Sequence, residues 1–226
     1  MAEHQLPGSP PVTVKLRRSG RARRISLRVS RLDGRVTLTL PPGVPDAEAL
    51  DFARSKQDWI RGHLDTRPLG IAVEPGIDLP IEGVPHRVTL IPGRRVLRQN
   101  GEIGVPGPDA ARRLQPWLRE LARDRLAAAA DHYAAMLGRP YHRLTMRDTR
   151  SRWGSCSSRG GLMFSWRLIL APPDILRYVA AHEVAHLAEM NHSPAFWATV
   201  QRLHGPCAAQ RQWLRREGGS LHMYQF

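Results

Sequence analysis

Apolar and polar residues alternate in three short runs near the start of the chain, at residues 12–16, 25–29 and 36–40. A period of two is typical of strands that bury one face. An Asp-Gly pair at 33–34 separates two of these runs. It favours a type I′ hairpin turn, which needs positive φ at both central positions. We therefore expect a small antiparallel sheet after a flexible, Pro/Gly-rich tail at residues 1–11.

The spacing becomes helical from Asp46, an acceptable N-cap, to Leu64. Leu50, Ala53 and Ile60 fall on one side of this segment, with polar residues opposite. This pattern predicts one amphipathic helix.

Short strands are expected again over residues 78–106, with Asn100 and Gly101 as a second hairpin turn. A long helical pattern follows and closes at Gly138, because glycine readily adopts the left-handed conformation that ends helices. Pro116 must lie near the start of that helix or bend it, since proline lacks a backbone N–H.

The last third of the chain combines two expected strands, around a Gly/Ser-rich turn, with three helices. The helices should begin near Pro172, Pro194 and Pro206, because proline suits the first helical position. Strands and separate helices, without an internal repeat, predict an α+β fold.

Positive charge is concentrated at the N-terminus. The chain carries a formal net charge of +14, and 32 of its 34 basic residues are arginine. Nine basic and two acidic residues fall in the first 35. Such a surface attracts phosphate backbones, although a solvated sheet face or a coding bias toward arginine also explains it. The candidate nucleic-acid-binding residues are Lys15, Arg17, Arg18, Arg21, Arg23 and Arg24.

Membrane spans and secretion are not expected. The chain has no run of 18 apolar residues, and its first residues lack the apolar core of a signal peptide. Cys156 and Cys207, the two cysteines, have no paired spacing, which predicts free thiols in a reducing compartment. We expect a cytoplasmic protein.

The stretch "HEVAHLAEMNH" contains the candidate metal ligands and the candidate catalytic base of the chain. His182 and His186 are four residues apart, so a helix would place both imidazoles on one face. Glu183 lies about 100° around the helix, within reach of a water on a shared metal. A catalytic zinc usually takes three protein ligands, and His192 supplies the third if Asn191 ends the helix and Ser193 caps the next.

Chance is a poor explanation of this motif. The chain's histidine and glutamate content yields HExxH roughly 0.02 times in a random sequence of this length, and a third histidine makes it rarer. A structural metal site is also disfavoured, because such sites are normally closed by four ligands. We therefore expect bound Zn²⁺ and a hydrolytic role.

Three segments in the same order resemble a known family. "RWGSC", "HEVAH" and "NHSPAFW" are similar to the bacterial YgjP-like metallopeptidase family, which is related to the SprT-like and WLM zinc peptidases. The resemblance is strongest over residues 143–204. It implies the zinc ligands His182, His186 and His192 and the catalytic Glu183, the assignment that spacing also predicts.

Two rival families share part of this spacing. Metzincins have the same distance to the third histidine, but they carry glycine where this chain has Glu189. A bacterial endoribonuclease family has the three histidines without a glutamate after the first. Glu183 favours peptide hydrolysis over that alternative, because a zinc-activated water needs an adjacent base.

The expected mechanism is that zinc acidifies its water, Glu183 removes the proton, and the hydroxide attacks a peptide carbonyl. The substrate would be a polypeptide. Arg152, Trp153 and Tyr178 are candidate substrate-binding residues, and the strand around Trp153 could receive an extended peptide. The alternative function is a nucleic-acid-associated protein, either a protease of DNA-bound proteins or a metal-dependent ribonuclease-like hydrolase.

The resulting domain prediction has three parts. A flexible tail occupies residues 1–11, and a β-rich region with one helix occupies residues 12–108. A zincin-like metallopeptidase domain, helical with a small sheet, occupies residues 109–226.

Overall fold

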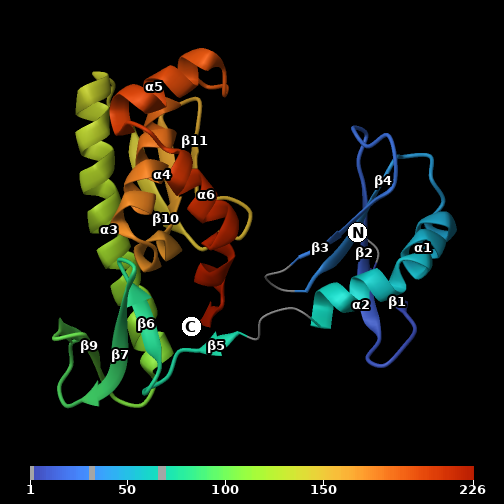
Figure 1. The fold of residues 1–226 in the computed structure, drawn as a ribbon, viewed down its shortest axis with the longest axis horizontal. Coiled ribbons are helices and arrows are strands. Elements are labelled where there is room, and N and C mark those ends of the chain that lie inside the picture. The colour runs from blue at the N-terminus through green and yellow to red at the C-terminus, as the bar shows by residue number, and fades with distance from the viewer. Residues whose placement is uncertain (1–2, 31–33, 66–69) are drawn as a thin grey trace. The chain divides into compact units, whose positions relative to one another are not determined.

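The chain forms two compact units that meet in sequence between residues 69 and 70 (Figure 1). The computed structural model describes residues 3–30, 34–65 and 70–226. Unit 1 comprises residues 1–69, and unit 2 comprises residues 70–226. Together they have the α+β composition that the sequence predicts.

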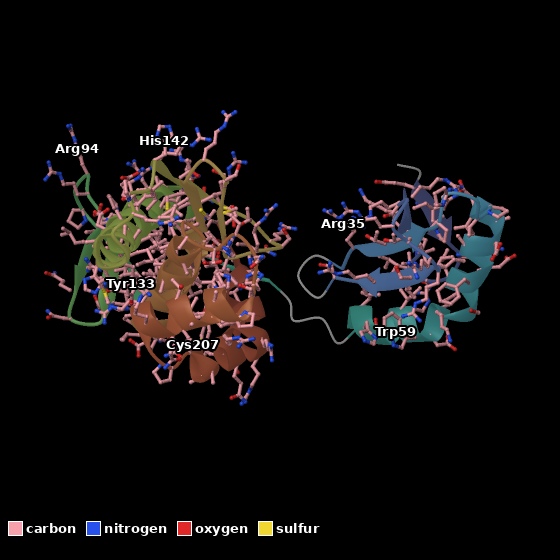
Figure 2. The ribbon with its side chains drawn as sticks, turned by 90° about the horizontal axis from the view of Figure 1, so that it is seen from above. Arg35, Trp59, Arg94, Tyr133, His142 and Cys207 are labelled. Carbon is pink, nitrogen blue, oxygen red and sulfur yellow. The ribbon has the colours of Figure 1, made fainter. Side chains whose placement is uncertain are left out.

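Unit 1 is a four-stranded sheet with two helices. Its strands follow the order β1-β2-β4-β3, and its core consists of the alternating apolar residues of the strands and residues of both helices. Figure 2 shows Trp59 of this unit, whose side chain stays 45% exposed. The elements are β1 (Glu3–Leu6), β2 (Val12–Arg18), β3 (Ser26–Val29), β4 (Val36–Leu40), α1 (Asp46–Ser55) and α2 (Gln57–Asp65).

Three details of unit 1 differ from the sequence prediction. β2 and β4 pair in parallel, so the sheet is mixed: β4 lies between β2 and β3. The expected tail contains β1, which pairs with β2. The sequence predicts one helix over residues 46–64, but the structure has two, α1 and α2. The break occurs because Lys56 leaves helical geometry at φ −109° and ψ 15°. The Asp-Gly pair at 33–34 falls partly outside the described residues, but β3 and β4 on either side do pair antiparallel.

Unit 2 begins with strands that pack on a long helix. The sheet β6-β7-β9-β8 and the helix α3 share one hydrophobic core. The division of the chain therefore lies at residue 70 and not after residue 108, because the strands at 78–106 bury their apolar face against α3. These elements are β5 (Ile71–Ala72), β6 (Asp78–Ile81), β7 (Val84–Ile91), β8 (Leu97–Gln99), β9 (Glu102–Pro106) and α3 (Ala110–Leu137).

The helix α3 has the boundaries that its capping residues predict. The Asp109 side chain accepts a hydrogen bond from the backbone N–H of Arg112 at 3.2 Å. Gly138 ends the helix with a left-handed φ of 70°. Pro116 lies in the second turn, where it removes one backbone donor and the helix continues.

The rest of unit 2 places a small sheet beside three short helices. The sheet has the order β10-β12-β11, which leaves β11 at an edge. Helices α4, α5 and α6 start close to the three prolines that the sequence indicates. These elements are β10 (Arg143–Arg147), β11 (Gly154–Cys156), β12 (Gly161–Ser165), the 3-10 helix η1 (Trp166–Leu170), α4 (Pro173–Ala185), α5 (Pro194–His204), α6 (Ala208–Arg216), the 3-10 helix η2 (Gly218–His222) and β13 (Tyr224–Gln225).

A buried arginine fastens the C-terminus to the core of unit 2. Arg167 is 8% exposed and forms an ion pair with Asp148 at 2.7 Å. It also donates to the carbonyls of Leu221 at 3.0 Å and Tyr224 at 2.9 Å. Because a buried charge needs such partners, these bonds fix β13 beside β5. No helix in the described part of the chain is both long and apolar enough to cross a membrane.

Two hairpin turns in unit 2 have the same backbone conformation. Asn100 and Gly101 have φ values of 51° and 77°, which fits the type I′ turn that the sequence predicts. Glu82 and Gly83 join β6 to β7 with φ values of 53° and 76°. The second turn is not obvious from the sequence, because glutamate rarely adopts positive φ.

This pair of turns allows a matched test of packing. Gly83→Ala and Gly101→Ala impose nearly the same backbone strain, about 1–3 kcal/mol. A Cβ at Gly83 would lie 3.0 Å from Pro172, whereas nothing lies within 4 Å of one at Gly101. We expect Gly83→Ala to lower the free energy of unfolding more than Gly101→Ala, as measured by urea denaturation. Equal losses would show that the turn does not pack tightly on Pro172.

Candidate metal centre

Two histidines project from the last turns of α4 onto one face. His182 and His186 have ring centroids 5.1 Å apart. The helix ends at Ala185, and His186 is its C-cap residue with a helical φ of −64°. The spacing of four residues therefore produces the pair that the sequence predicts.

His192 lies in the connection between α4 and α5 and points back at this pair. Its Nε2 is 3.1 Å from the Nε2 of His182. Ser193 caps α5 by accepting a hydrogen bond from the Phe196 N–H at 3.4 Å, as expected. Asn191 does not adopt the left-handed conformation expected of it, because α4 has already ended; its side chain accepts from the Ser193 N–H instead.

The three imidazoles fit one metal ion. One nitrogen from each histidine lies within 4.8 Å of the others. Two nitrogens bound at about 2.0–2.1 Å to a tetrahedral zinc lie about 3.3 Å apart, close to the 3.1 Å between His182 and His192. The His186 Nδ1 donates to the Glu189 carbonyl at 2.9 Å, which leaves its Nε2 free. The donor set and its geometry therefore suit zinc.

Burial keeps His182 and His186 in the form that binds metal. Desolvation, together with the neighbouring His186 and His192, lowers the pKa of His182 to about 4. Burial also lowers the pKa of His186. A neutral imidazole is a metal ligand and an imidazolium is not, so both residues are ready to bind near pH 7.

Aromatic residues of α5 hold the histidines in place. Phe196 stacks on His186 with centroids 4.5 Å apart, and Trp197 stacks on His192 at 5.8 Å. The Arg211 guanidinium lies 4.4 Å above the Trp197 ring. The rings restrict imidazole rotation, a preorganisation that metal sites and active sites need.

Glu183 lies beside the histidines, buried between α4 and the edge strand β11. It is 6% exposed, and a Cβ added at Gly154 would come within 2.5 Å of its Cγ. Burial raises the pKa of Glu183 to about 8, and the Arg152 guanidinium opposes this rise. The sequence does not reveal the contact at Gly154, although a glycine between bulky residues in a strand often marks a close approach.

The three candidate substrate-binding residues have different surroundings. Arg152 is exposed and precedes β11. It lies close enough to Glu183 to oppose the rise in the pKa of that carboxyl. Trp153 stacks on His222 with centroids 5.1 Å apart and packs against Gly218. Tyr178 is 6% exposed. Its ring makes edge-to-face contacts with His182 and with His204 of α5. Of the three, Arg152 is exposed, Trp153 is partly buried and Tyr178 is buried.

Cys156 also faces Glu183, two residues beyond Gly154 on β11. Burial, followed by the Glu183 charge, raises the pKa of the Cys156 thiol to about 11. It therefore remains a thiol at neutral pH, and its sulfur contacts the Ser157 carbonyl.

The basic cluster of unit 1 is partly used within the unit. Lys15 pairs with Glu3 at 2.5 Å, and Arg18 pairs with Asp46 and donates to the carbonyls of two further residues. The other four side chains are exposed and form no ion pair with a described residue; they are Arg17, Arg21, Arg23 and Arg24.

A family model and a solved structure are similar to parts of this chain. A solved structure, that of the metallopeptidase zymogen of Pyrococcus abyssi abylysin, is 18% identical, with a TM-score of 0.37 over 41% of this chain and 95% of that chain. No protein of curated function matches the chain. The model of the YgjP-like metallopeptidase domain matches residues 23–217, which include the three histidines and Glu183. The chain therefore belongs to the YgjP-like metallopeptidase family.

Proposed function

We propose that this chain is a zinc-dependent peptidase in which His182, His186 and His192 hold the metal and Glu183 is the general base. The observation that carries the proposal is the convergence of three imidazole nitrogens within 4.8 Å, beside a buried carboxylate. Three histidine ligands leave a fourth position free for substrate or water, as in catalytic zinc sites.

Glu183 is suited to move a proton during peptide hydrolysis. When bound, zinc supplies Lewis acidity, which polarises a carbonyl and makes water acidic near neutral pH. The Glu183 carboxylate would accept the proton of the attacking water and deliver it to the leaving amine. A zinc ion held by the three histidines would also favour the ionised form of Glu183, whereas burial raises the pKa of this carboxyl.

The edge strand β11 supports an extended polypeptide substrate. In the described chain its outer edge has no strand partner, and Gly154 brings its backbone against Glu183. A peptide that adds to this edge by main-chain hydrogen bonds would lie along the metal centre. Arg152, exposed at the start of the strand, is then the best placed of the three candidate residues to contact the substrate.

A second candidate function is binding to nucleic acid through unit 1. Alternation along β2 buries Val12, Val14 and Leu16 and places Arg17 on the opposite side. With Arg21, Arg23 and Arg24 exposed nearby in sequence, the basic cluster has charge available for phosphates. Such binding would direct the peptidase to DNA-associated proteins. It would equally suit a ribonuclease-like hydrolase, but the buried Glu183 favours the peptidase.

We also infer a reducing compartment, the cytoplasm, as the location. Cys156 and Cys207 are both free thiols in the structure. Free cysteines persist where the cellular thiol pool is reduced.

The role of Glu183 is tested by the Glu183→Gln variant. Glutamine has nearly the same shape but cannot accept the proton, so cleavage of an unfolded polypeptide such as casein should fall about 10²–10⁴-fold. Zinc content should be unchanged, because Glu183 is not a proposed ligand. Glu120→Gln, an exposed residue on α3, is the control and should retain full activity. An active Glu183→Gln enzyme would refute the role.

Nucleic-acid binding is tested by the salt dependence of affinity for a short DNA duplex. Replacing Arg17, Arg21, Arg23 and Arg24 with glutamine should reduce the slope of log K against log salt by about three to four, since each phosphate contact contributes about 0.9. The control removes four charges from α3 instead. Equal slopes for both variants would mean that net charge, and not the cluster, attracts DNA. The control substitutions are Arg112→Gln, Arg113→Gln, Arg119→Gln and Arg123→Gln.

A further inference from the structure

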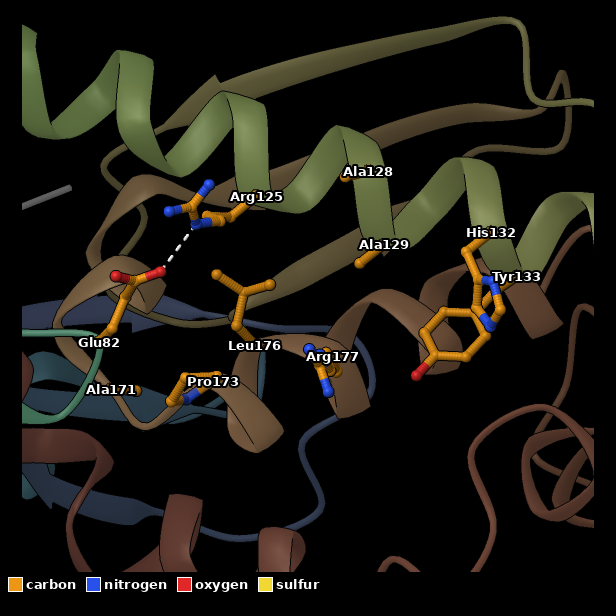
Figure 3. Close-up of a pocket in the computed structure, with 10 residues that line it drawn as sticks. All are labelled: Glu82, Arg125, Ala128, Ala129, His132, Tyr133, Ala171, Pro173, Leu176 and Arg177. Carbon is orange, nitrogen blue, oxygen red and sulfur yellow. Dashed lines mark hydrogen bonds and ion pairs between the residues drawn. The ribbon is translucent and has the colours of Figure 1, made fainter.

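Unit 2 contains a cavity that no part of the proposed function uses. A cavity of about 540 Å³ lies between α3 and the first turns of α4 (Figure 3). The turn between β6 and β7 closes one end with Glu82, and Tyr133 and Arg177 lie toward the other end. None of the three clustered histidines lines it.

The closed end of the cavity is held rigidly. The Glu82 carboxylate accepts hydrogen bonds from Arg125 at 2.7 Å and Arg98 at 2.6 Å, and its charge is thereby balanced. Its backbone N–H donates to the Ile169 carbonyl at 2.6 Å. Gly83 abuts Pro172, at the start of α4. These contacts preform the wall, so a ligand would not have to order it.

The middle of the cavity is apolar. Ala128 and Ala129 of α3 face Leu176 and Pro173 of α4 across it, as Figure 3 shows. Because the two alanines are small, the facing helices leave space that larger side chains would fill. A ligand lying here would contact carbon atoms on both sides, which favours an apolar body.

The other end carries positive charge and an unused hydroxyl. Tyr133 is only 7% exposed, yet its hydroxyl forms no hydrogen bond with a described residue and points into the cavity in Figure 3. Arg177 forms no ion pair within the described chain, and both Arg177 and Asp174 lie close enough to Tyr133 to influence it electrostatically. A guanidinium and an unpaired hydroxyl donor together match a carboxylate.

We propose that this cavity binds a carboxylate attached to an apolar body. The carboxylate lies between the Arg177 guanidinium and the Tyr133 hydroxyl, and the apolar body runs between Ala128, Ala129 and Leu176. A fatty acid and the C-terminus of a peptide share this chemistry. The site is separate from the metal centre and does not depend on the peptidase proposal.

Titration calorimetry on the full chain, with two matched pairs of compounds, tests the proposal. The probes are octanoate with octanamide and N-acetylphenylalanine with its amide. Each carboxylate should bind saturably and at least about tenfold more tightly than its neutral amide, because only the acid forms a charged hydrogen bond with arginine. The tighter of the two acids identifies the source as a lipid or a peptide terminus. Equal binding of acid and amide would overturn the proposal.

Single substitutions locate the binding. Arg177→Gln should weaken the carboxylate at least about tenfold, and Tyr133→Phe, which removes only the hydroxyl, about two- to tenfold. Arg113→Gln removes an exposed charge from α3 outside the cavity and should change nothing. If Arg113→Gln weakened binding as much as Arg177→Gln, the attraction would be general and the site refuted. Should Arg177→Gln fail to fold, the acid and amide comparison on the unaltered chain still decides.

Discussion

The candidate chemistry of this protein depends on the convergence of three imidazoles at the point where α4 ends. His182 and His186 share a helix face, and the turn into α5 returns His192 to within 3.1 Å of His182. Without a cation, three imidazoles so close gain little, since burial and their mutual influence only lower the pKa of His182 and of His186. The ends of α4 and α5, together with the Phe196 and Trp197 rings, hold the three imidazoles close together. A shared metal ion is the best physical explanation of this arrangement.

In the proposed function, the edge strand β11 is where a polypeptide would add beside the candidate metal centre. Gly154 allows the strand to approach α4 so closely that Glu183 is buried against its backbone. Trp153, held by His222 and Gly218, fixes the start of the strand. The C-terminal segment thus supports the position of the strand, and Arg167 in turn holds that segment through its bonds to the Leu221 and Tyr224 carbonyls.

The sequence predicted those features that depend on residues close together along the chain. Helical spacing gave the His182–His186 pair, and the Asn100–Gly101 turn has the conformation expected from its residues. Long-range pairing was harder: alternation identifies β2 and β4 as strands but not as parallel partners, and it cannot reveal that the strands at 78–106 pack on α3. The contact between Gly154 and Glu183 was missed for the same reason, since it joins residues from different elements.

Zinc binding by the three histidines can be measured on the purified protein, with metal content from mass spectrometry and the zinc environment from X-ray absorption. We expect about one zinc per chain with three nitrogen ligands, loss of that zinc in His192→Ala, and retention in His142→Ala, which removes an exposed histidine outside the cluster. A His192→Ala protein that keeps its zinc with an unchanged ligand environment would contradict this expectation.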